Sequence, residues 1–136
     1  MAYKNKEDQS RAAKRHYLLN KDKYLRKAYL HNKKTRCRNK IFIDNIKESS
    51  PCVDCGESNP IVLEFDHVRG VKKENVSDMV RQSYCLKTIQ EEIDKCEVRC
   101  ANCHRIVTHE RRQEKREKIE EAQEEEMSSQ LSMNFG

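Results

Sequence analysis

The sequence is poor in the residues that build a large apolar core and in those that interrupt secondary structure. Its 136 residues include no tryptophan, three phenylalanines, three glycines and two prolines, and 35% are hydrophobic against 38% charged. Domains with so little apolar surface to bury usually need a metal ion or disulfides for stability. We therefore expect a small core that is held together by crosslinks.

Long apolar segments are also missing. No run approaches the roughly 20 apolar residues that a membrane-spanning helix needs, and the first residues are not followed by the apolar stretch of a secretory signal. We expect a soluble, cytoplasmic protein that does not bind a membrane.

Positive charge is concentrated near the N-terminus. The net charge is +5, yet residues 1–47 hold 15 Lys/Arg against 4 Asp/Glu, a balance of +11. Tyr17, Tyr24 and Tyr29 lie among these cations. Such a segment can neutralise the phosphates of double-stranded DNA without reading its sequence. We expect a DNA-binding arm here, and a solvated pair of helices is the alternative.

The apolar periodicity predicts helices with two short strands. Helices are expected at 9–32, 36–48, 78–82, 86–95 and from 101 onward, and strands at 61–65 and 97–99. Ser77 is expected to cap the third helix, and the Ser49-Ser50-Pro51 step to end the second. Beyond Glu126 no period remains, and we expect that segment to be disordered.

Seven cysteines include two Cys-x-x-Cys pairs. These pairs are Cys52/Cys55 and Cys100/Cys103. Each such pair can bind Zn²⁺ from a tight turn, and two pairs complete the tetrahedral shell of a structural site. The spacing favours metal over disulfides in a reducing cytosol; an iron–sulfur cluster is the alternative. The remaining cysteines, Cys37, Cys85 and Cys96, are expected to be small, partly buried side chains, with Cys96 the candidate for a substitute ligand.

A second set of polar side chains lies beside the cysteine pairs. Asp66 and His67 follow the first predicted strand, and His104 follows the last paired cysteine. Carboxylate and imidazole suit a catalytic cation better than a zinc ion bound by thiolates. Hydrolysis of a phosphodiester needs such a cation and an activated water, and a neutral imidazole is a competent general base around pH 7. The pattern predicts Asp66 and His104 at the cation and His67 as the base.

Three motifs occur in the order Cys52-x-x-Cys55, Leu63-Glu-Phe-Asp-His67-Val68 and Cys100-Ala-Asn-Cys-His-Arg105. Together they resemble the zinc-ribbon-bearing HNH endonuclease family, which has a ββα-metal fold. The resemblance covers residues 51 to about 112. It implies that His67 is the general base, that Asp66 and His104 hold Mg²⁺ or Mn²⁺, and that the four cysteines hold Zn²⁺. Members of the family cut double-stranded DNA, often as nicks. Many come from phages or mobile elements, which implies the cytoplasm of a host cell.

The chain departs from the family at the asparagine that gives the middle letter of the name HNH. That asparagine usually lies a few residues before the second cysteine pair, where this chain has Lys95-Cys96-Glu97. Asn102 is the asparagine closest to the site, and we take it as the provisional orienting residue for His67. His109, five residues after His104, lies about 140° further round a helix. It is the less natural cation ligand and the alternative to His104.

Together these expectations describe an α+β chain. They place a basic helical arm at 1–50, a ββα-metal core with a four-cysteine zinc site at 51–112, and a charged helix with a disordered tail at 113–136. The leading function is metal-dependent cleavage of DNA, as nicks or double-strand breaks. The alternative, favoured by the missing asparagine, is a non-catalytic zinc-knuckle DNA-binding protein that assists phage packaging or transcription. Phage packaging proteins are candidate partners.

Overall fold

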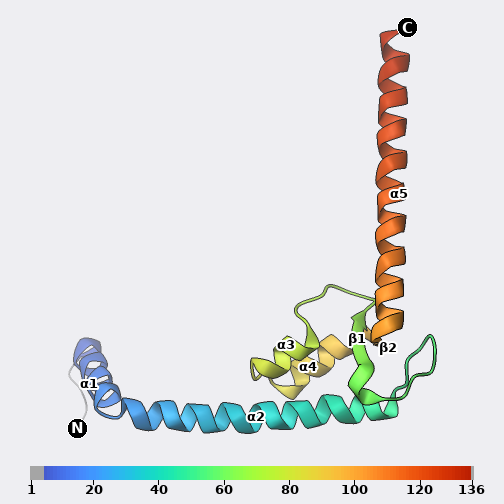
Figure 1. Ribbon diagram of the computed structural model, residues 1–136. Helices are drawn as coiled ribbons and strands as arrows, with labels where there is room; N and C mark the ends of the chain where they lie inside the picture. Colours follow the sequence, from blue (N-terminus) through green and yellow to red (C-terminus); the bar gives the residue numbers. More distant parts are fainter. Residues whose placement is uncertain (1–4, 136) are drawn as a thin grey trace.

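The computed structural model describes residues 5–135, and in this part of the chain it is mostly helical with one small antiparallel sheet. The elements are α1 (Lys6–Leu19), α2 (Lys21–Ser49), the short 3-10 helix η1 (Pro60–Val62), β1 (Leu63–His67), α3 (Val76–Arg81), α4 (Leu86–Ile93), β2 (Cys96–Cys100) and α5 (Ala101–Asn134). Figure 1 shows a small core at one end of α2, from which α5 leaves in a different direction. The α+β class is confirmed. No helix within residues 5–135 combines the length and apolar character needed to cross a membrane.

The N-terminal arm consists of α1 and the first part of α2. The side chain of Asn5 accepts a hydrogen bond from the N–H of Asp8 and caps α1. The arm bends at Asn20, whose side chain donates to the carbonyl of His16 and so ends α1. The prediction of two helices at 9–32 and 36–48 misplaced this break. Local hydrogen bonding by asparagine interrupts the helix although the apolar period continues through it.

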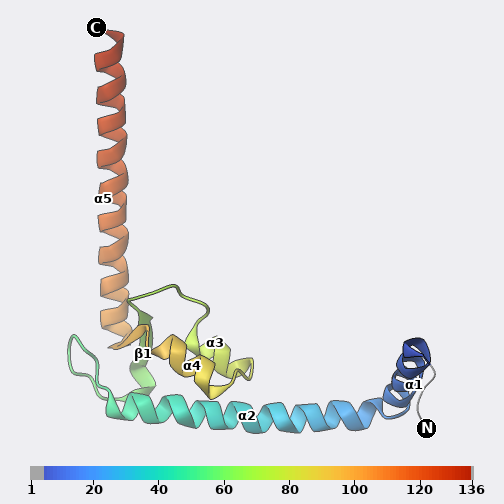
Figure 2. The same ribbon diagram turned by 180° about the vertical axis from the view of Figure 1, so that it is seen from behind.

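The last part of α2 belongs to the core. Ile43 packs with buried side chains of α3 and α4, and Asn39 donates to the carbonyl of Tyr84 at 2.8 Å. The buried apolar residues of this cluster are Ile43, Val76, Met79, Val80, Ile89 and Ile93. The part of the arm that does not contact the core therefore ends before Asn39. Helix α2 itself continues to Ser49, as the Ser49-Ser50-Pro51 step predicts. Figure 2 shows α3 and α4 lying against this end of α2 from the other side.

The sheet pairs β1 with β2 in an antiparallel register. Leu63 lies opposite Cys100 and His67 lies opposite Cys96. A second, smaller buried cluster consists of Cys52, Leu63, Val98 and Cys100. Phe65 packs against both clusters and joins the sheet to the helices. Because β2 leads directly into α5, the first turn of α5 lies beside β1.

Three local predictions need correction. The first strand covers Leu63–His67 rather than 61–65, because Pro60 starts a 3-10 turn. Helix α3 begins after Asn75, so Ser77 lies inside it and is not its cap. The segment beyond Glu126, predicted to be disordered, continues α5 to Asn134. It contains no glycine or proline before Gly136, and its serine hydroxyls donate to carbonyls of the preceding turn.

Candidate metal centre and functional site

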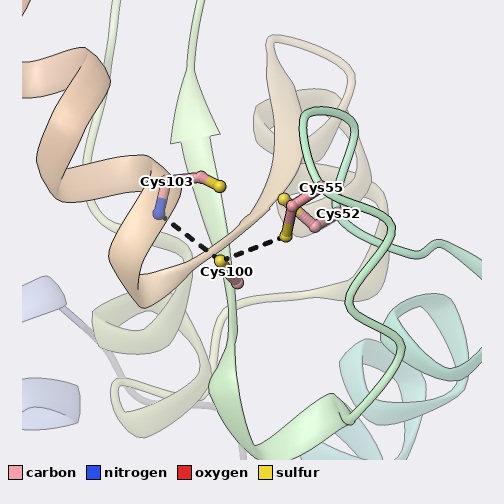
Figure 3. A group of neighbouring side chains, drawn as sticks. All are labelled: Cys52, Cys55, Cys100 and Cys103. Carbon is pink, nitrogen blue, oxygen red and sulfur yellow. Dashed lines mark hydrogen bonds between the residues drawn. The ribbon is translucent and has the colours of Figure 1, made fainter.

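The four paired cysteines come together as predicted. Cys52 and Cys55 lie in the turn after α2, Cys100 ends β2, and Cys103 lies in the first turn of α5 (Figure 3). Their sulfur atoms all lie within 4.8 Å of one another, and the Cys55 and Cys100 sulfurs are 3.7 Å apart. A tetrahedral Zn²⁺ with bonds of about 2.3 Å separates its sulfur ligands by about 3.8 Å. The cluster could therefore hold a metal ion such as Zn²⁺.

The crowding of these thiols controls their protonation. Burial would raise the pKa of the Cys52 thiol, but hydrogen bonds from the backbone of Cys100, Cys55 and Asp54 lower it to about 6. The neighbouring thiols of Cys100 and Cys55 instead raise the pKa of Cys103. Four thiolates this close repel one another, so a bound cation is needed to ionise all of them at neutral pH.

Arg99 connects the cysteine cluster to Asp66. It is buried on β2, and its Nε donates to Asp54 Oδ2 at 2.7 Å. Asp54 lies between Cys52 and Cys55, in the metal-binding turn itself. The Nη1 of the same guanidinium donates to Asp66 Oδ2 at 2.5 Å. The position of Asp66 is thus tied to the turn that carries the first cysteine pair.

Asp66 is held by two guanidinium groups. Its side chain is almost fully buried, and both of its oxygens accept hydrogen bonds from Arg111 of α5, at 2.9 and 3.0 Å. Burial would raise the pKa of Asp66, but the hydrogen bonds and charges of Arg111 and Arg99 lower it below its usual value. Asp66 is therefore ionised at neutral pH.

His104 approaches Asp66 from the first turn of α5. Its Nε2 lies 3.4 Å from Asp66 Oδ1, and its Nδ1 lies 2.6 Å from Glu64 Oε2. Glu64 and Asp66 are two residues apart in β1 and so share one face of the strand. The structure thus brings together Asp66 and His104, the two residues expected to hold the catalytic cation.

An open groove of ≈ 710 Å³ runs along the start of α5 and is lined by His104. Its lining includes Glu64, Asn102, His104, Arg105, His109 and Arg112. His109 lies 3.2 Å, Nε2 to Nε2, from Gln113 one turn further along. His109 and Asn102 thus share a surface with His104, and two arginines make that surface basic.

His67 lies on the other face of β1. Adjacent residues of a strand point to opposite faces, and the Nε2 of His67 lies 2.8 Å from Glu92 Oε1 on α4. The hydrogen-bond partner of His67 is therefore Glu92 and not Asn102, which was the provisional orienting residue. The imidazole is 14% exposed, so it can still be reached at the end of the strand.

Sequence reasoning missed Glu92, Arg99 and Arg111. A signal existed for Glu92, because it lies on the same side of its helix as Ile89 and Ile93 and so falls on the buried stripe. A charged residue at such a position must be paired. For the two arginines no local signal exists, because their partners are far away along the chain.

No protein-family model, curated protein or solved structure matches the chain. The function is therefore inferred from the side chains and their arrangement.

Proposed function

We propose that this chain is a metal-dependent DNA endonuclease of the HNH type, with a ββα-metal core formed by β1, β2 and the start of α5. In this proposal the four cysteines hold a structural Zn²⁺, and Asp66 and His104 hold a catalytic Mg²⁺ or Mn²⁺. The observation that carries it is the approach of Asp66 Oδ1 to His104 Nε2, 3.4 Å apart beside a basic groove. The order of the three sequence motifs supports the same function.

The donor atoms of Asp66 and His104 form a mixed oxygen and nitrogen pair. A carboxylate oxygen is a preferred ligand of Mg²⁺ and Mn²⁺, whereas an imidazole nitrogen favours transition metals, so the pair fits Mn²⁺ better than Mg²⁺. Two neighbouring ligands of an octahedral ion with bonds of about 2.1 Å are about 3 Å apart, close to the separation of these two atoms. Arg111 occupies both oxygens of Asp66, so cation binding requires that this guanidinium leave. Its side chain is 43% exposed and has room to do so.

A bound cation would neutralise charge on the phosphate and on the transition state. His67 would accept a proton from a water molecule. The water oxygen then forms a bond to phosphorus as the bond from phosphorus to the leaving ester oxygen breaks. The leaving oxygen keeps that electron pair and takes a proton from solvent. Since Asp66 and His67 are the last two residues of β1, a phosphate lying across the end of the strand would meet both.

The exposed cationic side chains of the N-terminal arm support DNA as the substrate. None of the residues of α1 is buried, and Tyr17 stacks on Tyr24 at 5.9 Å across the bend. Cationic side chains on both helices are exposed to solvent along the arm. We propose that the arm contacts the DNA backbone and holds the substrate near the core.

Plasmid cleavage tests this function. The zinc-loaded wild-type protein is incubated with supercoiled plasmid and Mg²⁺ or Mn²⁺, beside His67→Ala and the control His31→Ala, an exposed histidine of the arm. We expect relaxed or linear DNA from the wild type and the control, and a loss of at least about 100-fold in rate for His67→Ala. Supercoiled plasmid that stays intact with every cation contradicts the proposal.

A non-catalytic DNA-binding role is the second candidate. The paired state of the two central side chains favours it, because Asp66 is bound by Arg99 and Arg111 and His67 is bound by Glu92. In that case the buried charges stabilise the core, and the zinc-bearing chain acts as an accessory factor, for example in phage packaging or transcription. A band shift with plasmid that is not cut, identical in wild type and His67→Ala, is the result that supports it.

A further inference from the structure

Glu92 is a buried carboxylate in the midst of apolar side chains. It is 1% exposed, on the stripe of α4 that carries Ile89 and Ile93. Its Oε1 accepts hydrogen bonds from the Lys73 N–H at 2.9 Å and lies 2.8 Å from His67 Nε2, while its Oε2 accepts from Lys95 Nζ at 2.7 Å. A buried charge is costly unless it is paired, and these three contacts satisfy the group.

The protonation state of Glu92 fixes the roles of the two imidazole nitrogens. Burial would raise the pKa of Glu92, but the hydrogen bonds from Lys95, Lys73 and His67 lower it to about 2. An ionised carboxylate can only accept, so His67 Nε2 carries the hydrogen. In neutral imidazole the lone pair then lies on Nδ1, which is the nitrogen that can take a proton.

The same carboxylate holds the backbone that follows His67. Lys73 lies in the loop after β1, and Lys95, paired with Glu92, also donates to the carbonyl of Val71 at 2.8 Å. Val68 N–H donates to the carbonyl of Lys95 at 2.9 Å. Glu92 therefore restrains both the ring of His67 and the loop that follows β1.

We propose that Glu92 is the positioning residue of His67, the part that Asn102 was expected to play. The proposal rests on the endonuclease function above and names the group that orients its general base. Glu92 acts through His67 and does not touch the substrate. Asn102 lies on the exposed first turn of α5 and lines the groove with His104 and His109.

The test compares three substitutions in the zinc-loaded full chain. Glu92→Ala removes the acceptor, Glu92→Gln keeps an acceptor oxygen without the charge, and Glu91→Gln is the matched control at the exposed neighbour. The first readout does not depend on activity: the proton on His67 Nε2, hydrogen-bonded and shielded, gives a slowly exchanging imidazole N–H signal in NMR spectra of the wild type. The second readout is the cleavage rate at saturating and at low DNA concentration, measured well below the melting temperature of each variant.

We expect the N–H signal in wild type, Glu91→Gln and Glu92→Gln, and its loss in Glu92→Ala. We expect kcat to fall about 10- to 100-fold in Glu92→Ala with KM unchanged, by analogy with the partners that orient metal-bound histidines, and to recover largely in Glu92→Gln. If Glu92→Ala does not fold, Glu92→Gln carries the test, with the signal retained and kcat within about tenfold of wild type.

Two results overturn the inference. One is the absence of the protected N–H signal from the wild-type protein, whether or not it cuts DNA. The other is an active wild type whose kcat is unchanged in Glu92→Ala. A wild type that shows the signal but cuts no DNA refutes the endonuclease function instead, so the two failures are distinguishable.

Discussion

Loss of one cysteine ligand should unfold the sheet and the turn that carry the site. The strands β1 and β2 have five residues each, and ordering their backbone costs about 10–20 kcal/mol. The fully apolar side chains buried beside the cluster are Leu63 and Val98, which contribute about 3–6 kcal/mol together. The deficit is comparable to the apparent binding free energy of a structural Zn²⁺, about 10–16 kcal/mol. We therefore expect the cation to decide whether this part of the chain folds.

Cys55→Ser removes one ligand with little change in volume, and Cys37→Ser is the control, since Cys37 is an exposed free cysteine on α2. The assay is hydrogen exchange of backbone amides together with zinc content by elemental analysis. We expect the wild type and Cys37→Ser to bind one zinc and to protect the amides of β1 and β2. Cys55→Ser, and wild type treated with a strong chelator, should lose that protection. Protection that persists in a zinc-free Cys55→Ser protein would show that the sheet folds without the cation.

Three further outcomes are expected. Ile89→Ala, at a site with 0% exposure, should cost about 2–5 kcal/mol in urea unfolding, whereas Ile61→Ala, which is exposed, should cost little. Because the pKa of Glu92 is lowered to about 2, the ionised side chain contributes stability that is present above its unfolded-state pKa of about 4.3 and is lost as pH falls toward 2. The melting temperatures of wild type and Glu92→Gln should accordingly converge over that interval, and a difference that stays constant contradicts this. Replacing Lys23 and Lys27 of the arm by alanine should reduce the slope of log Kd against log salt by up to about 2; an unchanged slope means that neither contacts phosphate.

The parts of the site that follow from local spacing could be predicted from the sequence. Two residues between paired cysteines fix a tight turn within each pair, and two such pairs complete one tetrahedral zinc shell, so the meeting of Cys52, Cys55, Cys100 and Cys103 was predictable from ligand chemistry. The same holds for the α+β class, since the alternation in β1 and the apolar stripe of α4 are local patterns. The position of Asp66 near His104 follows because β2 runs directly into α5.

The contacts of the buried charged side chains with distant partners could not be predicted. Arg111 and Asp66 are 45 residues apart and His67 and Glu92 are 25 apart, and each pair forms only when the sheet and helices pack. The bend at Asn20 and the helical end of α5 were missed for another reason. Asparagine and serine can either interrupt a helix or bond within it, and the local sequence does not fix which of these occurs.

The most direct test of the central claim is the position of a second divalent cation. Crystals of the zinc-loaded protein would be soaked in Mn²⁺, and its anomalous signal located. We expect a peak bound by Asp66 Oδ1 and His104 Nε2, with the Arg111 guanidinium moved away from Asp66. An Mn²⁺ peak elsewhere, or no peak with Arg111 still on Asp66, would contradict the proposed catalytic site.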